Sequence, residues 1–152
     1  MELTYFLKNL PAFEDFQASH LAALANHLQV EEHADGHVFI EQGQQGRALY
    51  MLLQGAVRIT RHDQAGGEDY VLRELADGEL FGILSLVQNL PAMATCTAKG
   101  AVKVAALGYD DFRQLFSEAS PIGHHLQYMI AVQMARDLQE HNKRLRNALT
   151  AS

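Results

Sequence analysis

Short apolar runs punctuated by glycines fill the middle of this chain and most constrain its fold. Val57 and Ile59, and again Val102 and Val104, follow the two-residue period of a strand. Strands this short, separated by turn residues about every eight to twelve positions, predict an antiparallel barrel or jelly roll. The runs are 37–41, 48–53, 56–60, 70–75, 94–98 and 101–107, and the glycines around them are Gly36, Gly43, Gly46, Gly55, Gly66, Gly67, Gly78 and Gly100.

Four of these glycines are expected to have a purely structural role. Gly43, Gly46, Gly55 and Gly78 fall where tight turns need a positive φ, which glycine adopts without a steric penalty. They would shape the backbone whether or not the domain holds a ligand.

Helical patterns flank the strands on both sides. At the N-terminal side, apolar residues recur every three to five positions, with Ser19 as a candidate N-cap; they are Phe13, Phe16, Leu21, Leu24 and Leu28. At the C-terminal side, Asp110 can cap a turn that reaches Phe116. Ser120 and Pro121 then read as the N-cap and first residue of a long helix, because proline needs no N–H partner there.

The long helix carries two apolar faces. Up to Leu149 only Gly123 could interrupt it, which gives a length of about 40 Å. One face, suited to packing on the barrel, consists of Ile122, Leu126, Met129 and Ile130. The other follows alternating three- and four-residue steps, the heptad seam of a coiled coil, and consists of Ala131, Met134, Leu138, His141, Leu145 and Ala148. We expect a two-fold homodimer through Met134, Leu138, His141 and Leu145; the alternative is a helix that lies wholly on its own domain.

Composition narrows the classes of function. A chain of 152 residues with 48% hydrophobic content can form one domain with a core of its own. Twelve basic against eighteen acidic residues, a net charge of −6, argue against a nucleic-acid surface. The single cysteine, Cys96, cannot form an internal disulfide, which favours the cytoplasm. No apolar run reaches the ~18–20 residues of a membrane span, and no signal peptide is apparent.

Two segments carry the most specific motif. Residues 81–86 read FGILSL, and residues 91–98 read PAMATCTA. Together they resemble the phosphate-binding cassette of the cyclic-nucleotide-binding domain family, whose usual pattern is F-G-E-L-[AGS]-L, a short spacer and P-R-[ST]-A. Residues 10–13 resemble the family's N-terminal helix, 41–58 its glycine-spaced signature, 75–82 its turn into the cassette, and 133–138 the dimer helix of the catabolite-activator (Crp/Fnr) branch.

The resemblance implies a fold and a domain organisation. The fold would be mainly β with flanking helices: an antiparallel jelly roll with a long C-terminal dimerisation helix. Residues 1–120 would form the β-roll domain with its N-terminal helix, and residues 121–152 the long helix. Transcriptional regulators of this branch carry a winged helix-turn-helix after that helix, and this sequence contains none, so we expect no nucleic-acid binding by this chain.

The cassette departs from the family pattern at two positions. Ile83 stands where the family's glutamate grips the ribose hydroxyl, and Ala92 where its arginine neutralises the cyclic phosphate. Gly82 keeps the backbone N–H groups of the cassette available. Burying a phosphate charge without its partner costs several kcal/mol, and about 1.4 kcal/mol is tenfold in affinity. We therefore expect that cAMP and cGMP are not bound in the usual way.

The candidate ligand site is then an apolar pocket. Ser85 and Thr95 supply the nearest hydroxyls, and the resemblance puts His141 and Asn142 near the nucleobase position; the alternative is that His141 is a seam residue only. The candidate ligand-binding residues are Phe81, Gly82, Ile83, Leu84, Ser85, Ala92, Met93, Ala94, Thr95, His141 and Asn142.

Three hypotheses follow. The leading one is a stand-alone, non-catalytic sensor domain for a small-molecule effector, without a cofactor; an alternative to it is the sensor half of a Crp/Fnr-type transcriptional regulator that binds a cyclic nucleotide. The second is a ligand-free dimeric module that recruits a protein partner. The third is a metal-dependent cupin-like enzyme using His33, His37 and Glu41, against which Gly36 interrupts the strand and no H-x-H pair is present, so that surface histidines are the favoured interpretation.

Overall fold

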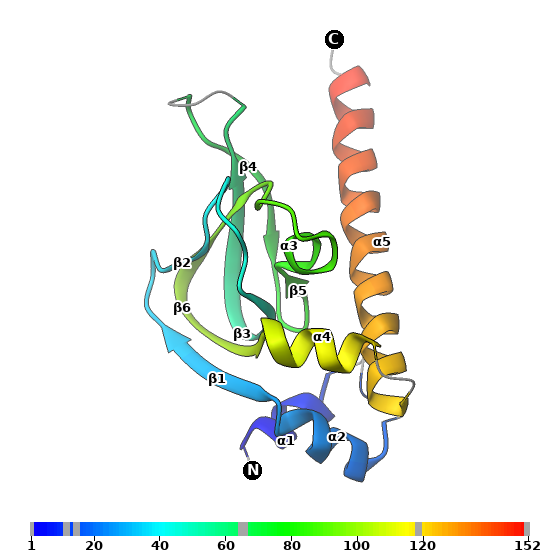
Figure 1. Cartoon of the computed structure of the whole chain (residues 1–152). Helices are drawn as coiled ribbons and strands as arrows, with labels where there is room; N and C mark the ends of the chain where they lie inside the picture. Colours follow the sequence, from blue (N-terminus) through cyan, green and yellow to red (C-terminus); the bar gives the residue numbers. More distant parts are fainter. Residues whose placement is uncertain (1, 11–12, 14–15, 64–66, 118–119, 151–152) are drawn as a thin grey trace.

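The computed structural model describes residues 2–10, 13, 16–63, 67–117 and 120–150 (Figure 1). Pro11 and Ala12 of the predicted N-terminal motif, and Gly66, lie outside them. The helices are α1 (Glu2–Lys8), α2 (Ala18–Ala25), α3 (Ile83–Gln88), α4 (Tyr109–Ser117) and α5 (Pro121–Thr150). The strands are β1 (Leu28–His33), β2 (Val38–Ile40), β3 (Ala48–Arg61), β4 (Tyr70–Leu75), β5 (Leu80–Phe81) and β6 (Thr95–Gly108).

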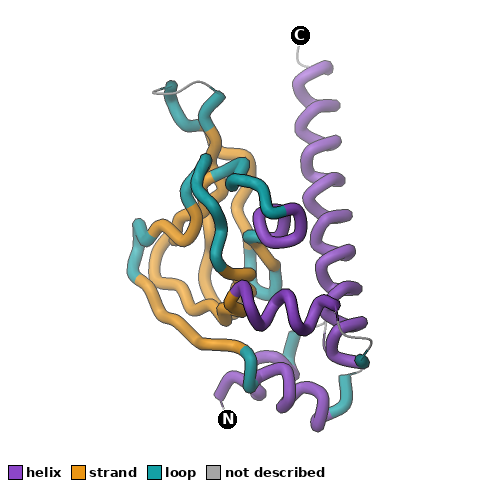
Figure 2. The backbone as a smooth tube through the Cα atoms, viewed as in Figure 1, coloured by secondary structure: helices purple, strands orange, loops and turns teal. Residues whose placement is uncertain are grey.

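Two long antiparallel strands organise the sheet. β3 and β6 pair from Ala48 opposite Gly108 to Thr60 opposite Thr95, with irregular register on both sides of Gln54. The order is β1-β6-β3-β4, while β2 pairs with β6 and β5 with β3, all antiparallel. The strands curl into a roll, with helices below and to one side (Figure 2). The predicted antiparallel jelly roll with flanking helices is confirmed.

The core has two parts. Inside the roll, the buried cluster includes Leu52, Val57, Leu75 and Val104. Between the lower end of the roll and the helices, a second cluster joins α1, α2, α4 and α5 to the sheet through residues such as Leu7. The two clusters fix the roll to its helices from separate sides.

α5 is the element that extends farthest from the core. Its N-terminal half packs on the domain through the face predicted for this purpose, since Leu126, Met129 and Ile130 are buried and Ile122 is partly buried against them. The Ser120 hydroxyl accepts a hydrogen bond from the N–H of Gly123 at 3.1 Å, so Ser120 caps the helix as predicted. The C-terminal half of α5 stands to one side of the roll (Figure 1), and all its residues from 141 to 150 are exposed.

Four expectations about the elements were wrong. Asp110 does not cap α4, because it lies inside that helix, which begins at Tyr109. The helix cap near the N-terminus is Gln17, not Ser19, which lies inside α2. Leu28 begins strand β1 rather than ending a helix. β1 has no apolar run because it lies at the sheet edge, where none of its residues is fully buried and polar side chains such as Glu31 and Glu32 are tolerated. The pairs of runs around Gly55 and Gly100 are single strands, because each glycine bends its strand without ending it.

The glycine predictions hold at three of four positions. Gly43, Gly55 and Gly78 have positive φ, but Gly46 does not. Gly46 is required for space instead: a Cβ there would lie 2.8 Å from the Cβ of Ser85, whose hydroxyl accepts the Gly46 N–H at 2.9 Å. The constraint on Gly46 therefore comes from packing against the cassette.

Gly82 combines both constraints at the start of α3. Its φ is +89°, and a Cβ there would lie 2.8 Å from the carbonyl oxygen of Ala48. Gly36 has nearly the same φ, +88°, but nothing lies within 4 Å of its Cβ position. The two glycines thus separate the conformational penalty from the steric one.

We predict that Gly36→Ala lowers the free energy of unfolding by about 1–2 kcal/mol, the penalty for a side chain in the left-handed region. Gly82→Ala should lower it further, by about 1–3 kcal/mol more, because the backbone at Ala48 must also move. Urea denaturation of the two variants measures the difference. Equal losses would mean that the contact at Gly82 relaxes freely.

Candidate functional site

A cavity of about 630 Å³ lies between the cassette, the roll and α5. α3 and the segment after it form one wall, the sheet forms the floor, and the middle of α5 forms the opposite wall. The lining residues are Ile40, Ile59, Leu80, Phe81, Gly82, Ile83, Leu84, Ser85, Ala92, Met93, Ala94, Cys96, Met134, Ala135, Asp137 and Leu138. Leu84, Met93, Met134 and Leu138 are exposed apolar side chains, as expected at the mouth of an open cavity.

Backbone contacts hold the two cassette segments in place. The left-handed conformation of Gly82 turns the chain from β5 into α3, and Asn89, also left-handed, ends that helix. Ala92 then pairs with the turn at 43–44: its N–H donates to the Gln44 carbonyl, and its carbonyl accepts the Gly43 N–H, both at 2.8 Å. The two segments therefore meet at the cavity without help from a ligand.

The two positions that depart from the family pattern both face the cavity. Ile83 is only 6% exposed and packs in the core cluster around the helices, and Ala92 is partly buried against the cluster inside the roll. Neither can form a hydrogen bond or an ion pair through its side chain. The wall that would meet a ribose and a phosphate is apolar in this chain.

The cassette hydroxyls are already engaged. Ser85 lines the cavity, but its hydroxyl accepts the Gly46 N–H and donates to the Leu90 carbonyl at 2.5 Å. The Thr95 hydroxyl accepts the N–H of Gln42 at 3.0 Å, and Thr95 does not line the cavity. Both hydroxyls hold the cassette together and contribute little to a ligand.

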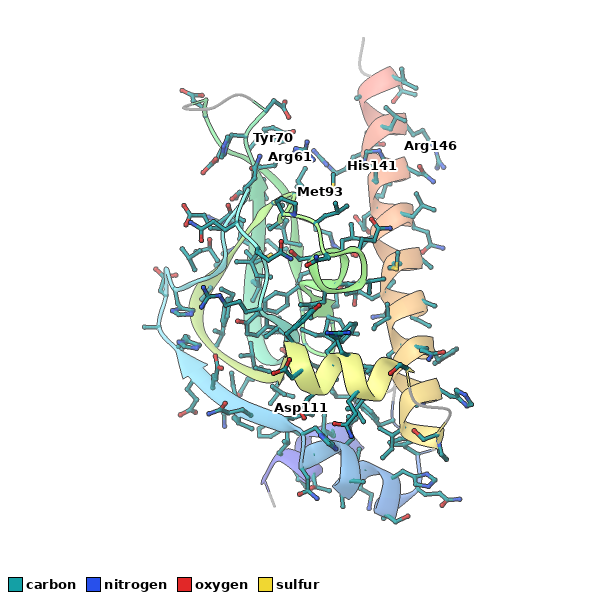
Figure 3. All side chains as sticks on the ribbon, in the orientation of Figure 1. Arg61, Tyr70, Met93, Asp111, His141 and Arg146 are labelled. Carbon is teal, nitrogen blue, oxygen red and sulfur yellow. The ribbon has the colours of Figure 1, made fainter. Side chains whose placement is uncertain are left out.

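Most of the candidate residues come together, and three do not. Phe81, Gly82, Ile83, Leu84, Ser85, Ala92, Met93 and Ala94 line the cavity, whereas Thr95, His141 and Asn142 do not. Figure 3 shows His141 farther along α5 than the level of α3, while Met93 lies at the upper part of the roll and Asp111 at the opposite end, on α4. His141 and Asn142 are exposed in the single chain.

Sequence reasoning missed half of the cavity wall. The sheet adds Ile40, Ile59, Leu80 and Cys96, and α5 adds Met134, Ala135, Asp137 and Leu138. The alternation of Val57 with Ile59 could have placed Ile59 on the inner face. Asp137 falls within residues 133–138, which resemble the family's dimer helix, but that resemblance gave it no role in the site, because its role depends on how α5 packs.

Asp137 belongs to a polar network between the sheet and α5. One guanidinium nitrogen of Arg73 on β4 donates to Asp137 and another to Glu79, each at 2.5 Å. The side-chain amide of Gln133 donates to Glu79 at 3.2 Å and to Asp137 at 3.1 Å, and its oxygen accepts the N–H of Leu80 at 2.8 Å. Gln133 and Glu79 are buried, so the network fixes α5 to the strand that leads into the cassette.

Burial raises the pKa of Asp137, with Glu79 adding to the effect, while the hydrogen bond from Gln133 and the charge of Arg73 oppose it. A carboxyl with a raised pKa holds its proton more tightly in the folded chain than in the unfolded one. Its ionisation therefore lowers stability as the pH rises from the unfolded pKa through the folded one. Arg73 and Gln133 therefore do not fully offset the cost of burying the negative charge of ionised Asp137.

The basic side chains of the neighbouring strands are paired away from the cavity. Lys99 and Arg58 pair with Glu74, and Arg61 pairs with Asp63. Among the residues that the structure describes, no lysine or arginine lines the cavity. An anionic ligand would find no cationic side chain in this described wall.

The histidines of the metalloenzyme hypothesis form a different arrangement. The rings of His33 and His37 stack with centroids 3.6 Å apart, and His33 is hydrogen-bonded to Glu31 at 2.9 Å. Burial and the neighbouring His33 lower the pKa of His37. In the described part of the chain, no group of three or more potential ligands could hold a metal ion.

No helix in the described part of the chain is long and apolar enough to cross a membrane.

Comparison with known proteins agrees with this architecture. Residues 30–119 match the family described as the cyclic nucleotide-binding domain. A cAMP-dependent protein kinase regulatory subunit of Yarrowia lipolytica is 34% identical over 122 residues, which cover 80% of this chain and 31% of that protein. The chain therefore spans less than a third of this curated relative.

Solved structures of regulatory proteins are also similar to this chain. The catabolite activator protein of Thermus thermophilus is 28% identical with a TM-score of 0.72, covering 91% of this chain and 62% of that one. A regulatory subunit of a cAMP-independent protein kinase A from Trypanosoma cruzi, bound to guanosine, is 25% identical with a TM-score of 0.63, covering 84% and 48%.

The fold and the cassette define a regulatory, ligand-binding type of domain. This chain belongs to the cyclic nucleotide-binding domain family. The family resemblance drawn from the cassette is thereby confirmed.

The buried cysteine of the cavity gives a first test. Burial raises the pKa of Cys96 to about 12, so at pH 8 its thiolate fraction is about a thousandfold below that of an ordinary cysteine. We predict that a maleimide labels Cys96 in the folded chain slower by about that factor than in the chain unfolded in urea. Mass spectrometry of timed samples measures both rates. Comparable rates would show that the thiol is accessible.

Proposed function

We propose that this chain is a regulatory domain whose cavity binds a small molecule other than cAMP or cGMP. The observation that carries the proposal is the cavity itself, about 630 Å³ and walled jointly by the cassette and α5. This volume is within the range of about 300–1,000 Å³ typical of ligand sites. A ligand bound there would contact the long helix directly, so binding could change the position of a helix that lies outside the roll.

The charges around the cavity support a ligand other than a cyclic nucleotide. The two positions that the family uses for ribose and phosphate are Ile83 and Ala92, and Asp137, the carboxylate among the described lining residues, would repel a phosphate. The Trypanosoma cruzi relative is described as cAMP-independent and bound to guanosine. Because guanosine is an uncharged nucleoside, that protein is an example of a similar regulatory subunit whose bound ligand carries no phosphate.

The second candidate, a ligand-free protein-interaction module, fits the cavity less well. In that case apolar side chains such as Ile83 and Met93 would fill the space between cassette and roll. An open cavity remains instead, with Met93 exposed at its mouth. The volume therefore favours the sensor over the filled module.

We predict that calorimetric titration finds no binding of cAMP or cGMP with a dissociation constant at or below about 10 μM. Ala92→Arg returns the phosphate partner at a partly buried position, and should tighten cAMP binding about tenfold or more. Tight binding by the unmodified chain would overturn the proposal. If Ala92→Arg does not tighten cAMP binding, the missing arginine at position 92 is not the reason why the chain binds cAMP weakly.

The exposed half of α5 supports the proposed homodimer. Leu138 and Leu145 are 60% and 52% exposed in the single chain, one heptad apart. Leu145 lies outside the cavity lining, so it can be changed without altering the ligand site. Pairing of such leucines across a two-fold axis would contribute about 1.5–3 kcal/mol each.

We predict that Leu145→Glu dissociates the dimer, because each glutamate would have to be desolvated beside its symmetry copy. Gln139→Glu adds the same charge to an exposed position of α5 off the seam and should leave the dimer intact. Analytical ultracentrifugation of the wild type and both variants at tens of micromolar measures whether each is a dimer or a monomer. A monomeric wild type, or a Leu145→Glu variant that remains dimeric, would exclude this helix as the interface.

A further inference from the structure

The polar network at the cavity wall carries an unbalanced charge. Arg73 supplies one positive charge, whereas Glu79 and Asp137 supply two negative charges when ionised, which leaves one negative charge over. The side chains of Arg73 and Glu79 are only 17% and 11% exposed, while that of Asp137 is 48% exposed and lines the cavity. The excess negative charge is therefore presented to the cavity at Asp137.

The geometry leaves part of the Asp137 carboxylate available. Within the described residues, the hydrogen bonds that Asp137 accepts from Arg73 and Gln133 both reach Oδ1. A carboxylate can accept about four hydrogen bonds through its two oxygens. Oδ2 can therefore receive a donor from inside the cavity without displacing Arg73.

The rest of the cavity wall selects for apolar structure. The Ser85 hydroxyl is taken by Gly46 and Leu90, and burial keeps the Cys96 thiol neutral by raising its pKa. The remaining lining side chains of α3, the sheet and α5 are aliphatic, aromatic or thioether groups, apart from Gly82. A ligand must thus be largely apolar and can place its one polar group at Asp137.

We propose that this cavity takes a small hydrophobic amine, with its ammonium group bound by the carboxylate of Asp137 and its apolar part between α3 and α5. The inference rests on the proposed ligand-sensing function and names the class of ligand. An ammonium group balances the extra negative charge of the network, while an anion would meet that charge without a cationic partner. The raised pKa of Asp137 agrees with this assignment, because a bound cation supplies what the ionised carboxylate lacks.

The position of Asp137 gives the amine a mechanical consequence. Asp137 lies one helical turn after Gln133, the residue that fixes α5 to the strand before the cassette. An ammonium at Oδ2 and an alkyl group against Leu84 and Met93 would connect α5 to the cassette through the ligand. Occupancy of the cavity would therefore stiffen the contact between these two elements.

A matched series of probes tests the proposal: n-octylamine, n-octanol and octanoate, which share one alkyl chain and differ in head-group charge. We expect calorimetry at neutral pH to rank the amine about tenfold or more tighter than the alcohol, with octanoate weakest. Asp137→Asn should remove the preference for the amine, while Glu140→Gln, a loss of the same charge on α5 outside the lining residues, should retain it. Ala92→Phe, which fills the cavity, should weaken all three.

The outcomes distinguish the amine proposal from the sensing function. Equal binding of amine and alcohol, tighter binding of octanoate, or an amine preference that survives Asp137→Asn would overturn the amine proposal and leave the cavity as a ligand site. Binding that Ala92→Phe leaves unchanged would place the amine elsewhere and also overturn it. Failure of all three probes would count against both the amine and the proposed sensing function. The ranking in the wild type needs no variant, so a variant that does not fold leaves the test intact.

Discussion

The hydrogen bonds of Gln133 are the interaction on which the site depends. Its side-chain oxygen accepts the Leu80 N–H, and its nitrogen donates to Glu79 and Asp137. Glu79 in turn accepts the Ala76 N–H at 2.8 Å, which shapes the turn before β5. One buried amide thus sets the position of α5 against the strand that leads into the cassette. The apolar face of α5 holds the start of the helix on the domain, and these hydrogen bonds hold its middle at the cavity, where it forms the third wall.

The sequence predicted what depends on local patterns. Glycine spacing and alternation at Val57 and Val102 indicated the roll, and Ser120 with Pro121 indicated the start of α5. The cassette was visible because its residues are contiguous and their order is specific. β1 was missed because an edge strand needs no continuous apolar run, and its polar side chains carry no period strong enough to separate strand from loop.

The cavity itself was only half predictable, for a physical reason. Residues 81–94 could be assigned from their order along the chain, whereas Asp137 acquires its role from a packing register that pairs α5 with β4 and β5. His141 and Asn142 were extrapolated along the same helix, but both are exposed and neither lines the cavity.

Met134 and Leu138 belong to two surfaces at once. They line the mouth of the cavity, and they also belong to the face of α5 proposed to meet a second copy. If α5 pairs in this way, ligand binding and association act on the same side chains and must be thermodynamically linked in both directions. The apparent affinity for a ligand would then vary with the concentration of the protein itself, so that the cellular abundance of the chain becomes one of the variables that sets its sensitivity.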